Sequence, residues 1–330
     1  MLASLLLAAA LAPSADARPD IAAANKILGR GMNLGNALDA PTEGAWGMKI
    51  EPEYLKAIKA AGFDSVRVPV KWSAHAAADA PYAIDPDFFR RIDEVLDLAE
   101  ANRLNVVLDL HHYDGMDEAP DKNLPRLVGL WKQIASRYRG RPASVFFELD
   151  NEPHNKLTEA KWNEVIPPVL AEVRKTNPTR PVIVGPAMWN GIGSLRKLKL
   201  PDDPNLIVTV HYYSPFEFTH QGAEFAPPKV RDRTGLTWVG NDAQTAALRT
   251  DFDAAAQWAK ENNRPVYLGE FGSYSKADMD SRGRWTRAVV HEAEARGFSW
   301  AYWEFGAGFG AYDRDKKQWR QPLLDALMQK

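Results

Sequence analysis

Short apolar segments alternate with amphipathic segments along most of the chain. Runs rich in Val, Ile and Leu are typical of strands that are buried on both faces of a parallel sheet. Between them hydrophobic residues recur at helical spacing, and Asp85-Pro86 predicts a helix start, with an aspartate cap and a first-turn proline. The pattern predicts eight strands, at residues 31–34, 65–70, 105–110, 145–149, 182–184, 207–212, 266–268 and 300–303.

Eight strand–helix units favour one fold class, an α/β (β/α)8 barrel, also called a TIM barrel. An open doubly wound sheet more often has fewer strands and a glycine-rich phosphate turn, and the chain shows no such turn. A length of 330 residues suits a single barrel. Residues 18–330 contain no evident linker, low-complexity tract or repeat, so we expect one domain there.

The composition is that of an ordinary globular protein, with 45% apolar and 25% charged residues. A net charge of -2 with scattered Lys and Arg argues against a nucleic-acid partner. The absence of cysteine excludes disulfides and thiolate chemistry. After the N-terminal segment no run is apolar and long enough to predict a membrane span, and we expect a monomer.

The first 17 residues resemble a secretory signal peptide. Residues 1–11 are almost entirely Leu and Ala, too short to span a bilayer, and Ala15-Asp16-Ala17 forms a small-x-small cleavage pattern. No basic residue precedes Arg18, and the alternative is a frayed apolar tail. We expect cleavage after Ala17 and a secreted or periplasmic protein.

Two predicted strands lead into glutamates, at Glu152 and at Glu270. Two carboxyls about 5 Å apart are the minimum apparatus for splitting a glycosidic bond with acid assistance and nucleophilic attack. In a TIM barrel the chemistry sits where strands end. These positions carry polar and aromatic residues, which predicts a site made of Asn33, Arg67, His111, His112, Asn151, Glu152, His211, Tyr213, Glu270, Trp303 and Glu304.

The order of these motifs resembles glycoside hydrolase family 5, a retaining family of clan A. The likeness covers residue 30 to the C-terminus and is closest to single-domain bacterial endoglucanases, some of which also accept mannan. The segment 211–222 carries that closer likeness. The motifs are Gly31-Met32-Asn33-Leu34-Gly35-Asn36, Val66-Arg67-Val68-Pro69, His111-His112, Asn151-Glu152-Pro153, His211-Tyr212-Tyr213, Gly269-Glu270-Phe271 and Ala301-Tyr302-Trp303-Glu304.

The resemblance implies roles for the two glutamates and for their neighbours. Glu152 would be the acid/base and Glu270 the nucleophile, kept ionised by Arg67 and by a hydrogen bond from Tyr213. His211 would help to cycle the proton of Glu152. Asn151 would bond the sugar 2-hydroxyl, Trp303 would stack on a pyranose, and Glu304 would reach a hydroxyl.

Tryptophans in predicted βα loops are candidate sugar platforms, namely Trp46, Trp72 and Trp189. Those in helical stretches are expected to be packing residues: Trp131, Trp162, Trp258 and Trp285. Phe225 stands at a loop position where close relatives carry a tryptophan. The smaller ring there would alter affinity or polymer preference.

We therefore expect an endo-β-1,4-glucanase that acts on cellulose or mixed-linkage glucan without a cofactor or metal. Endo-β-1,4-mannanase, or dual activity, is the first alternative. A metallohydrolase with Asp109, His111, His112 and His211 as ligands is another, although hydrogen bonding to sugar hydroxyls explains these histidines. A noncatalytic carbohydrate-binding barrel would keep the aromatic platforms but would lose a carboxylate or Arg67, and all of these are present.

Overall fold

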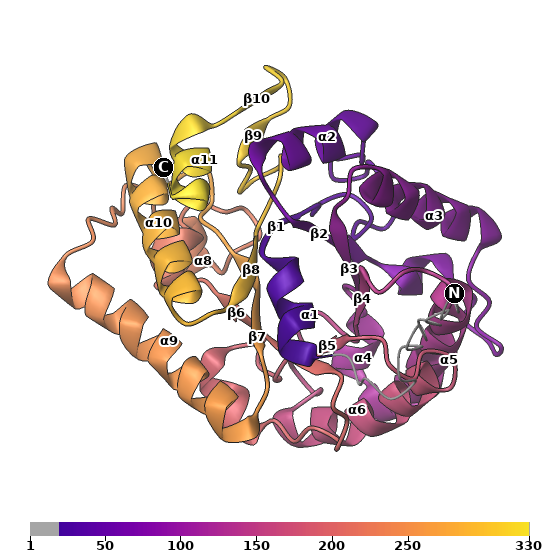
Figure 1. The fold of residues 1–330 in the computed structure, drawn as a ribbon. Coiled ribbons are helices and arrows are strands. Elements are labelled where there is room, and N and C mark those ends of the chain that lie inside the picture. Colours follow the sequence, from indigo (N-terminus) through magenta and orange to yellow (C-terminus); the bar gives the residue numbers. More distant parts are fainter. Residues whose placement is uncertain (1–19, 330) are drawn as a thin grey trace, which may run out of the picture.

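The computed structural model describes residues 20–329, so the predicted signal peptide lies outside the described residues. Eight parallel strands close into a barrel in sequence order, with helices around the outside (Figure 1). This confirms the predicted TIM barrel. The strands are β1 (Arg30–Asn33), β2 (Ser65–Val70), β3 (Asn105–Leu110), β4 (Val145–Glu148), β5 (Val182–Val184), β6 (Leu206–Tyr212), β7 (Val266–Phe271) and β8 (Ser299–Tyr302).

Most connections between strands contain an α-helix, but the β5–β6 connection carries only a 3-10 helix. That connection is rich in Gly and Pro, which interrupt α-helices. Asp85 caps α3 as predicted, accepting from the Asp87 N–H. The helices are α1 (Ile21–Leu28), α2 (Pro52–Ala61), η1 (Trp72–His75), α3 (Pro86–Ala101), α4 (Asp114–Glu118), α5 (Pro120–Tyr138), α6 (Glu159–Arg174), η2 (Ile192–Lys197), α7 (Phe216–Thr219), α8 (Pro228–Arg231), α9 (Asp242–Asn262), α10 (Met279–Ala295) and α11 (Gln321–Met328); a short hairpin, β9 (Tyr312–Asp313) and β10 (Gln318–Trp319), precedes α11.

The inside of the barrel has an apolar lower layer and a charged upper layer. Val107 and Phe146 belong to an apolar cluster to which six strands contribute. Two residues further along the same strands, Asp109 and Glu148 point into the same interior, because every second side chain of a strand faces one way. The charged layer therefore lies toward the carboxyl ends of the strands.

Helix α1 covers the opposite, amino-terminal end of the barrel (Figure 1). Leu28 joins the interior apolar cluster. The Asn25 amide donates to the Val266 carbonyl at 3.0 Å and accepts from the Ser299 hydroxyl at 2.8 Å. These contacts tie α1 to β7 and β8, so the barrel interior is covered from below.

A larger apolar cluster fills the space between the strands and the surrounding helices. The four tryptophans expected to be packing residues, Trp131, Trp162, Trp258 and Trp285, are all buried there. Trp72, predicted as a sugar platform, is also fully buried, against Phe88 and Phe89. That prediction was wrong because η1 turns the ring toward α3 instead of the barrel mouth.

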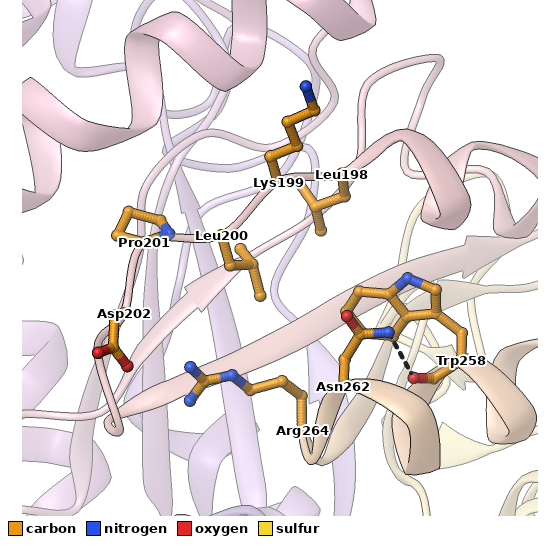
Figure 2. A pocket seen from close by; sticks show the side chains of 8 residues that line it. All are labelled: Leu198, Lys199, Leu200, Pro201, Asp202, Trp258, Asn262 and Arg264. Carbon is orange, nitrogen blue, oxygen red and sulfur yellow. Dashed lines mark hydrogen bonds between the residues drawn. The ribbon is translucent and has the colours of Figure 1, made fainter.

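A cavity of about 400 Å³ lies between the η2–β6 connection and the end of α9, and Figure 2 shows the side chains that line it. Its lining includes Pro201, Arg264 and Asn262, whose amide donates to the Trp258 carbonyl at 2.8 Å. These residues precede β6 and β7, so the cavity lies at the amino-terminal rim, away from the charged layer. Among the described residues no helix is long and apolar enough to span a membrane.

Candidate active site

Glu152 and Glu270 come together at the carboxyl-terminal rim of the barrel. Glu270 is the fifth residue of β7, and Glu152 lies four residues after the end of β4. One carboxylate oxygen of each, together with a ring nitrogen of His211, forms a group whose members all lie within 4.8 Å of one another. The two carboxyls are therefore close enough to act on the same carbon atom.

Arg67 connects the site to the barrel interior. It is the third residue of β2, deeper than the strand-end position that the sequence suggested, but its long side chain reaches the upper layer. Its Nη1 lies 2.7 Å from Glu270 Oε1, and its Nε and Nη2 lie 2.7 and 3.0 Å from the two Glu148 oxygens. Nη2 also lies 3.0 Å from Asp109 Oδ2. One buried cation is thus shared by three carboxylates.

Glu148 was not predicted as a member of the site, and Asp109 was named only as a ligand in the metallohydrolase alternative. Both side chains are fully buried, and burial raises the pKa of each to about 7 against the opposing effect of Arg67. A signal was available, because each is an acidic residue inside an otherwise apolar strand. A charge at such a position is rarely buried without a partner.

The two predicted asparagines orient Arg67. Asn33 is fully buried; its oxygen accepts from Arg67 Nη1 at 3.0 Å, and its amide donates to the Gly269 carbonyl at 2.9 Å. Asn33 therefore supports the guanidinium. Asn151 Oδ1 accepts from Arg67 Nη2 at 2.7 Å, which fixes the amide and makes its NH2 group the remaining donor.

His211, on β6, and Tyr213, directly after β6, hold the two glutamates in place. His211 Nδ1 lies 2.7 Å from Glu152 Oε1 and 3.6 Å from Glu270 Oε2, and the Tyr213 hydroxyl donates to Glu270 Oε2 at 2.8 Å. A register shift between Val210 and His211 changes the pairing of β6 with β7, so that His211 lies opposite Glu270. Gly269 leaves room for the ring, since a Cβ there would lie 3.1 Å from His211 Nε2.

Burial raises the pKa of both Glu152 and Glu270 to about 7. His211, Arg67 and the Tyr213 hydroxyl oppose this rise at Glu270. Glu270 is the better stabilised carboxylate, so it loses its proton first. Its negative charge then repels a second negative charge and hinders ionisation of Glu152. The site can therefore hold one ionised and one protonated carboxyl near neutral pH, as a nucleophile and an acid require.

His111, His112 and Trp303 form an aromatic group beside the carboxylates. His111 Nδ1 lies 2.5 Å from Asp109 Oδ2, and its ring stacks on Trp303 with 5.7 Å between centroids. His112 packs edge-on against His111. Gly35 permits the position of the indole, because a Cβ there would lie 2.7 Å from its nearest ring atom.

Three of the predicted platforms are exposed on loops at this rim: 43% of Trp46, 47% of Trp189 and 69% of Phe225 is accessible to solvent. Trp46 packs against His112, and Trp189 stacks on His154 with 5.0 Å between ring centroids. Exposed aromatic faces at fixed positions suit stacking on sugar rings. These residues lie on three different βα loops, which follow β1, β5 and β6.

Glu304 does not reach toward a sugar, contrary to expectation. Its side chain is fully buried, and its carboxylate accepts from the backbone N–H groups of Gly306, Ala307 and Phe309 at 2.7 to 3.2 Å. The loop after β8 would otherwise leave these donors without partners in a buried place. Glu304 therefore shapes the loop that follows Trp303.

The residues named as ligands in the metallohydrolase alternative bond to other side chains. Asp109 and His111 bond to each other, and the Arg67 guanidinium contacts Asp109. Two other groups in the described part of the chain bring ligand atoms within 4.8 Å, namely Asp39 with His111 and His112, and Glu152 with His211 and Glu270. A fixed guanidinium repels a metal cation, so the residues around Arg67 do not fit the proposed metallohydrolase centre.

Comparison with known protein families agrees with this geometry. The family described as cellulase (glycosyl hydrolase family 5) matches residues 22–308. The chain belongs to glycosyl hydrolase family 5. The resemblance inferred from the motifs is thereby confirmed.

The curated relatives include proteins that are longer than this chain. Endoglucanase H of Acetivibrio thermocellus is 36% identical over 307 residues, which cover 91% of this chain and 33% of that protein. Endoglucanase B of Clostridium cellulovorans is 30% identical, covering 88% of this chain and 71% of that protein. The chain thus spans about a third of the first relative's length.

Solved structures of similar length resemble the whole barrel. Thermotoga maritima Cel5A, solved in complex with cellobiose, is 48% identical with a TM-score of 0.92, covering 93% of this chain and 100% of that one. The same protein has been solved with a mannotriose substrate, with the same identity, coverage and TM-score.

Proposed function

We propose that this member of family 5 is a retaining endo-β-1,4-glucanase. The observation that carries the proposal is the placement of Glu152 and Glu270 within 4.8 Å, one beside His211 and the other between Arg67 and Tyr213. This arrangement supports a double displacement at one anomeric carbon. The endoglucanase names of the relatives support the same activity.

In the first step a Glu270 oxygen attacks the anomeric carbon while the bond to the leaving oxygen breaks. The bonding electrons go to that oxygen, which takes the proton of Glu152. In the second step Glu152 removes a proton from water, the water oxygen bonds to the anomeric carbon, and Glu270 is released as a carboxylate. Arg67 and Tyr213 stabilise that carboxylate before and after its covalent use.

The anomer formed first tests the mechanism. Proton NMR during hydrolysis of cellopentaose should show the β-anomer before mutarotation, because two inversions restore the configuration. Initial formation of the α-anomer would rule out the retaining assignment. Viscosity of carboxymethyl cellulose should fall faster than reducing ends appear, because cuts are expected inside the polymer.

Glucan is the favoured substrate, and β-mannan is the second candidate. The mannotriose complex of Thermotoga maritima Cel5A supports mannan as a candidate substrate, since glucose and mannose differ only at C2. Parallel kcat/KM values on carboxymethyl cellulose, barley glucan and glucomannan decide between glucanase, mannanase and dual activity. A higher value on a pure mannan would displace the glucan assignment.

Two assays address the remaining alternatives. Activity should survive a chelator, whereas loss that is restored by zinc would favour a metallohydrolase. A noncatalytic carbohydrate-binding barrel would bind oligosaccharides without producing reducing ends. We also propose export with cleavage after Ala17, which N-terminal sequencing of the mature protein would test.

A further inference from the structure

Asn190 holds His211 through both its backbone and its side chain. It is fully buried in the loop after β5, in a left-handed conformation with φ 53°. Its carbonyl accepts from the His211 backbone N–H at 3.0 Å. Its amide nitrogen contacts the Asn151 carbonyl oxygen and lies 3.3 Å from His211 Nε2. None of the motifs pointed to Asn190, because it lies outside the strand ends.

The orientation of the Asn190 amide follows from its partners. A backbone carbonyl can only accept a hydrogen bond, so the atom facing the Asn151 oxygen must be the NH2 group. The flipped amide would place two oxygens in contact. Within residues 20–329 Oδ1 has no hydrogen-bond partner, and it lies over Gly185, where a Cβ would come within 2.0 Å of it. Glycine at position 185 therefore makes room for this orientation.

The same NH2 group has a second hydrogen to donate, and His211 Nε2 is its acceptor. A ring nitrogen that accepts carries no proton, so in the neutral imidazole the proton is on Nδ1. Burial lowers the pKa of His211 to about 4, which keeps the ring neutral near pH 7. Nδ1 lies 2.7 Å from Glu152 Oε1 and can donate to it.

We propose that Asn190 is a positioning residue that fixes the Nδ1–H tautomer of His211, so that the acid proton of Glu152 stays on the oxygen facing the substrate. The inference rests on the proposed acid/base role of Glu152. When Nδ1–H donates to Oε1, the carboxyl proton belongs on Oε2 and is free for the leaving oxygen. In the other tautomer Nδ1 would accept that proton in an O–H···N bond and would compete with the leaving oxygen.

Two substitutions at position 190 distinguish this role from simple packing. Both Gly and Asp tolerate the left-handed backbone. Asn190→Gly removes the donor. Asn190→Asp keeps nearly the same shape, and its carboxyl must be protonated to donate to the Asn151 carbonyl. That oxygen then offers His211 Nε2 an acceptor in place of the amide donor, which demands a proton on Nε2. A structural role predicts greater damage from the deletion. The tautomer role predicts greater damage from the isosteric aspartate.

The kinetic test compares leaving groups. In Asn190→Asp, kcat/KM on cello-oligosaccharides should fall about 100-fold, within the usual range of acid–base contributions. On dinitrophenyl cellobioside, whose leaving group needs little protonation, the loss should stay below about tenfold. Equal losses on both substrates, or a larger loss in Asn190→Gly, would overturn the proposal. Asn263→Asp and Asn263→Gly are matched controls, because Asn263 is exposed and has φ 49°.

A spectroscopic measurement of the His211 ring is independent of activity. With 15N-labelled histidine, the wild-type His211 ring should show a protonated Nδ1 and an unprotonated Nε2 at pH 7; the signal is identified by its absence in His211→Gln. Asn190→Asp should place a proton on Nε2. An Nε2–H tautomer in the wild type would refute the proposal. If the Nδ1–H form is found in a protein that cleaves no glucan, the proposed function fails and the tautomer assignment stands.

Discussion

The Arg67 guanidinium lies 2.7 Å from the Glu270 carboxylate, and both side chains are almost completely withdrawn from water. The same guanidinium also meets Asp109 and Glu148. The nucleophile is therefore one member of a buried group of charges that β2, β3, β4 and β7 hold together. Stability and catalysis are coupled through this group.

Replacing the nucleophile should abolish turnover and preserve binding. Glu270→Gln removes the group that attacks the anomeric carbon, so we expect kcat to fall by about four or more orders of magnitude, as for other lost nucleophiles. The Kd for cellotetraose, measured by calorimetry, should change less than about tenfold. Glu261→Gln, at an exposed position near the end of α9, serves as the control. Turnover equal to that of the parent would end the assignment of Glu270.

Replacing the acid should produce a loss that depends on the leaving group. Glu152→Gln cannot protonate the departing oxygen, so polymer hydrolysis should fall by about 10²–10⁴-fold. Formation of the covalent intermediate from dinitrophenyl cellobioside should be affected much less, as the burst of released dinitrophenol will show. A uniform loss on both substrates would contradict the role of Glu152.

Removing the shared cation should destabilise the barrel. Arg67→Met leaves three buried carboxylates without their partner, and breaking buried pairs costs about 3–5 kcal/mol. The loss in the free energy of unfolding at pH 7 should shrink at pH 5, where the carboxyls take up protons. Urea unfolding at both pH values measures it. The exposed Arg231→Met should change nothing measurable, and an unchanged Arg67→Met protein would refute the idea of a shared cation.

The Glu152 carboxyl should make the folded protein less stable as the pH rises from about 4.5 through about 7. Burial raises the pKa of Glu152 to about 7, above the usual value of 4.5, so the folded protein binds this proton more tightly than the unfolded chain. The stabilising contribution is complete below about pH 4.5 and is lost as the pH rises through about 7. Glu152→Gln removes this titration and the repulsion from Glu270. The variant should exceed the parent in unfolding free energy at pH 8.5 by roughly 1–3 kcal/mol and should match it at pH 4.5.

If the unfolding free energies of variant and parent differ by the same amount at pH 4.5 and at pH 8.5, burial does not raise the pKa of Glu152. Differential scanning calorimetry over the pH series provides the check. Glu164→Gln, an exposed substitution on α6, is a suitable control for the loss of one acidic group.

Two tryptophans should separate substrate binding from packing. Trp189→Ala should weaken the Kd for cellotetraose by about tenfold, because stacking contributes about 1 kcal/mol or more, and should leave the melting temperature nearly unchanged. Trp72→Ala should cost about 3–5 kcal/mol of stability, because it empties a fully buried position. The reverse pattern would contradict the burial of these two rings.

Strand positions could be predicted because buried parallel strands require continuous apolar runs. All eight predicted strand starts lie within one residue of the observed ones. β7 extends further than predicted, through Glu270, since the shifted pairing with β6 continues past Gly269. Periodicity could not reveal that extension, because it depends on a neighbouring strand.

The direction of side chains was harder to predict. Trp72 and Trp189 both follow strands, but only the folded loops determine which ring turns outward. Glu304 adjoins Trp303 in sequence, yet its buried backbone partners draw it away from the substrate side. Asn190 was missed for a related reason, since its partners lie 21 and 39 residues away in the chain.

Helix α1 seals the barrel at the end remote from Glu152 and Glu270. Engineers who wish to make the protein more heat-resistant can therefore work on that base, for example around Leu28 and Asn25, with little risk to chemistry performed on the other side. Thermal stability can thus be altered at one end of the barrel, and substrate selectivity at the other.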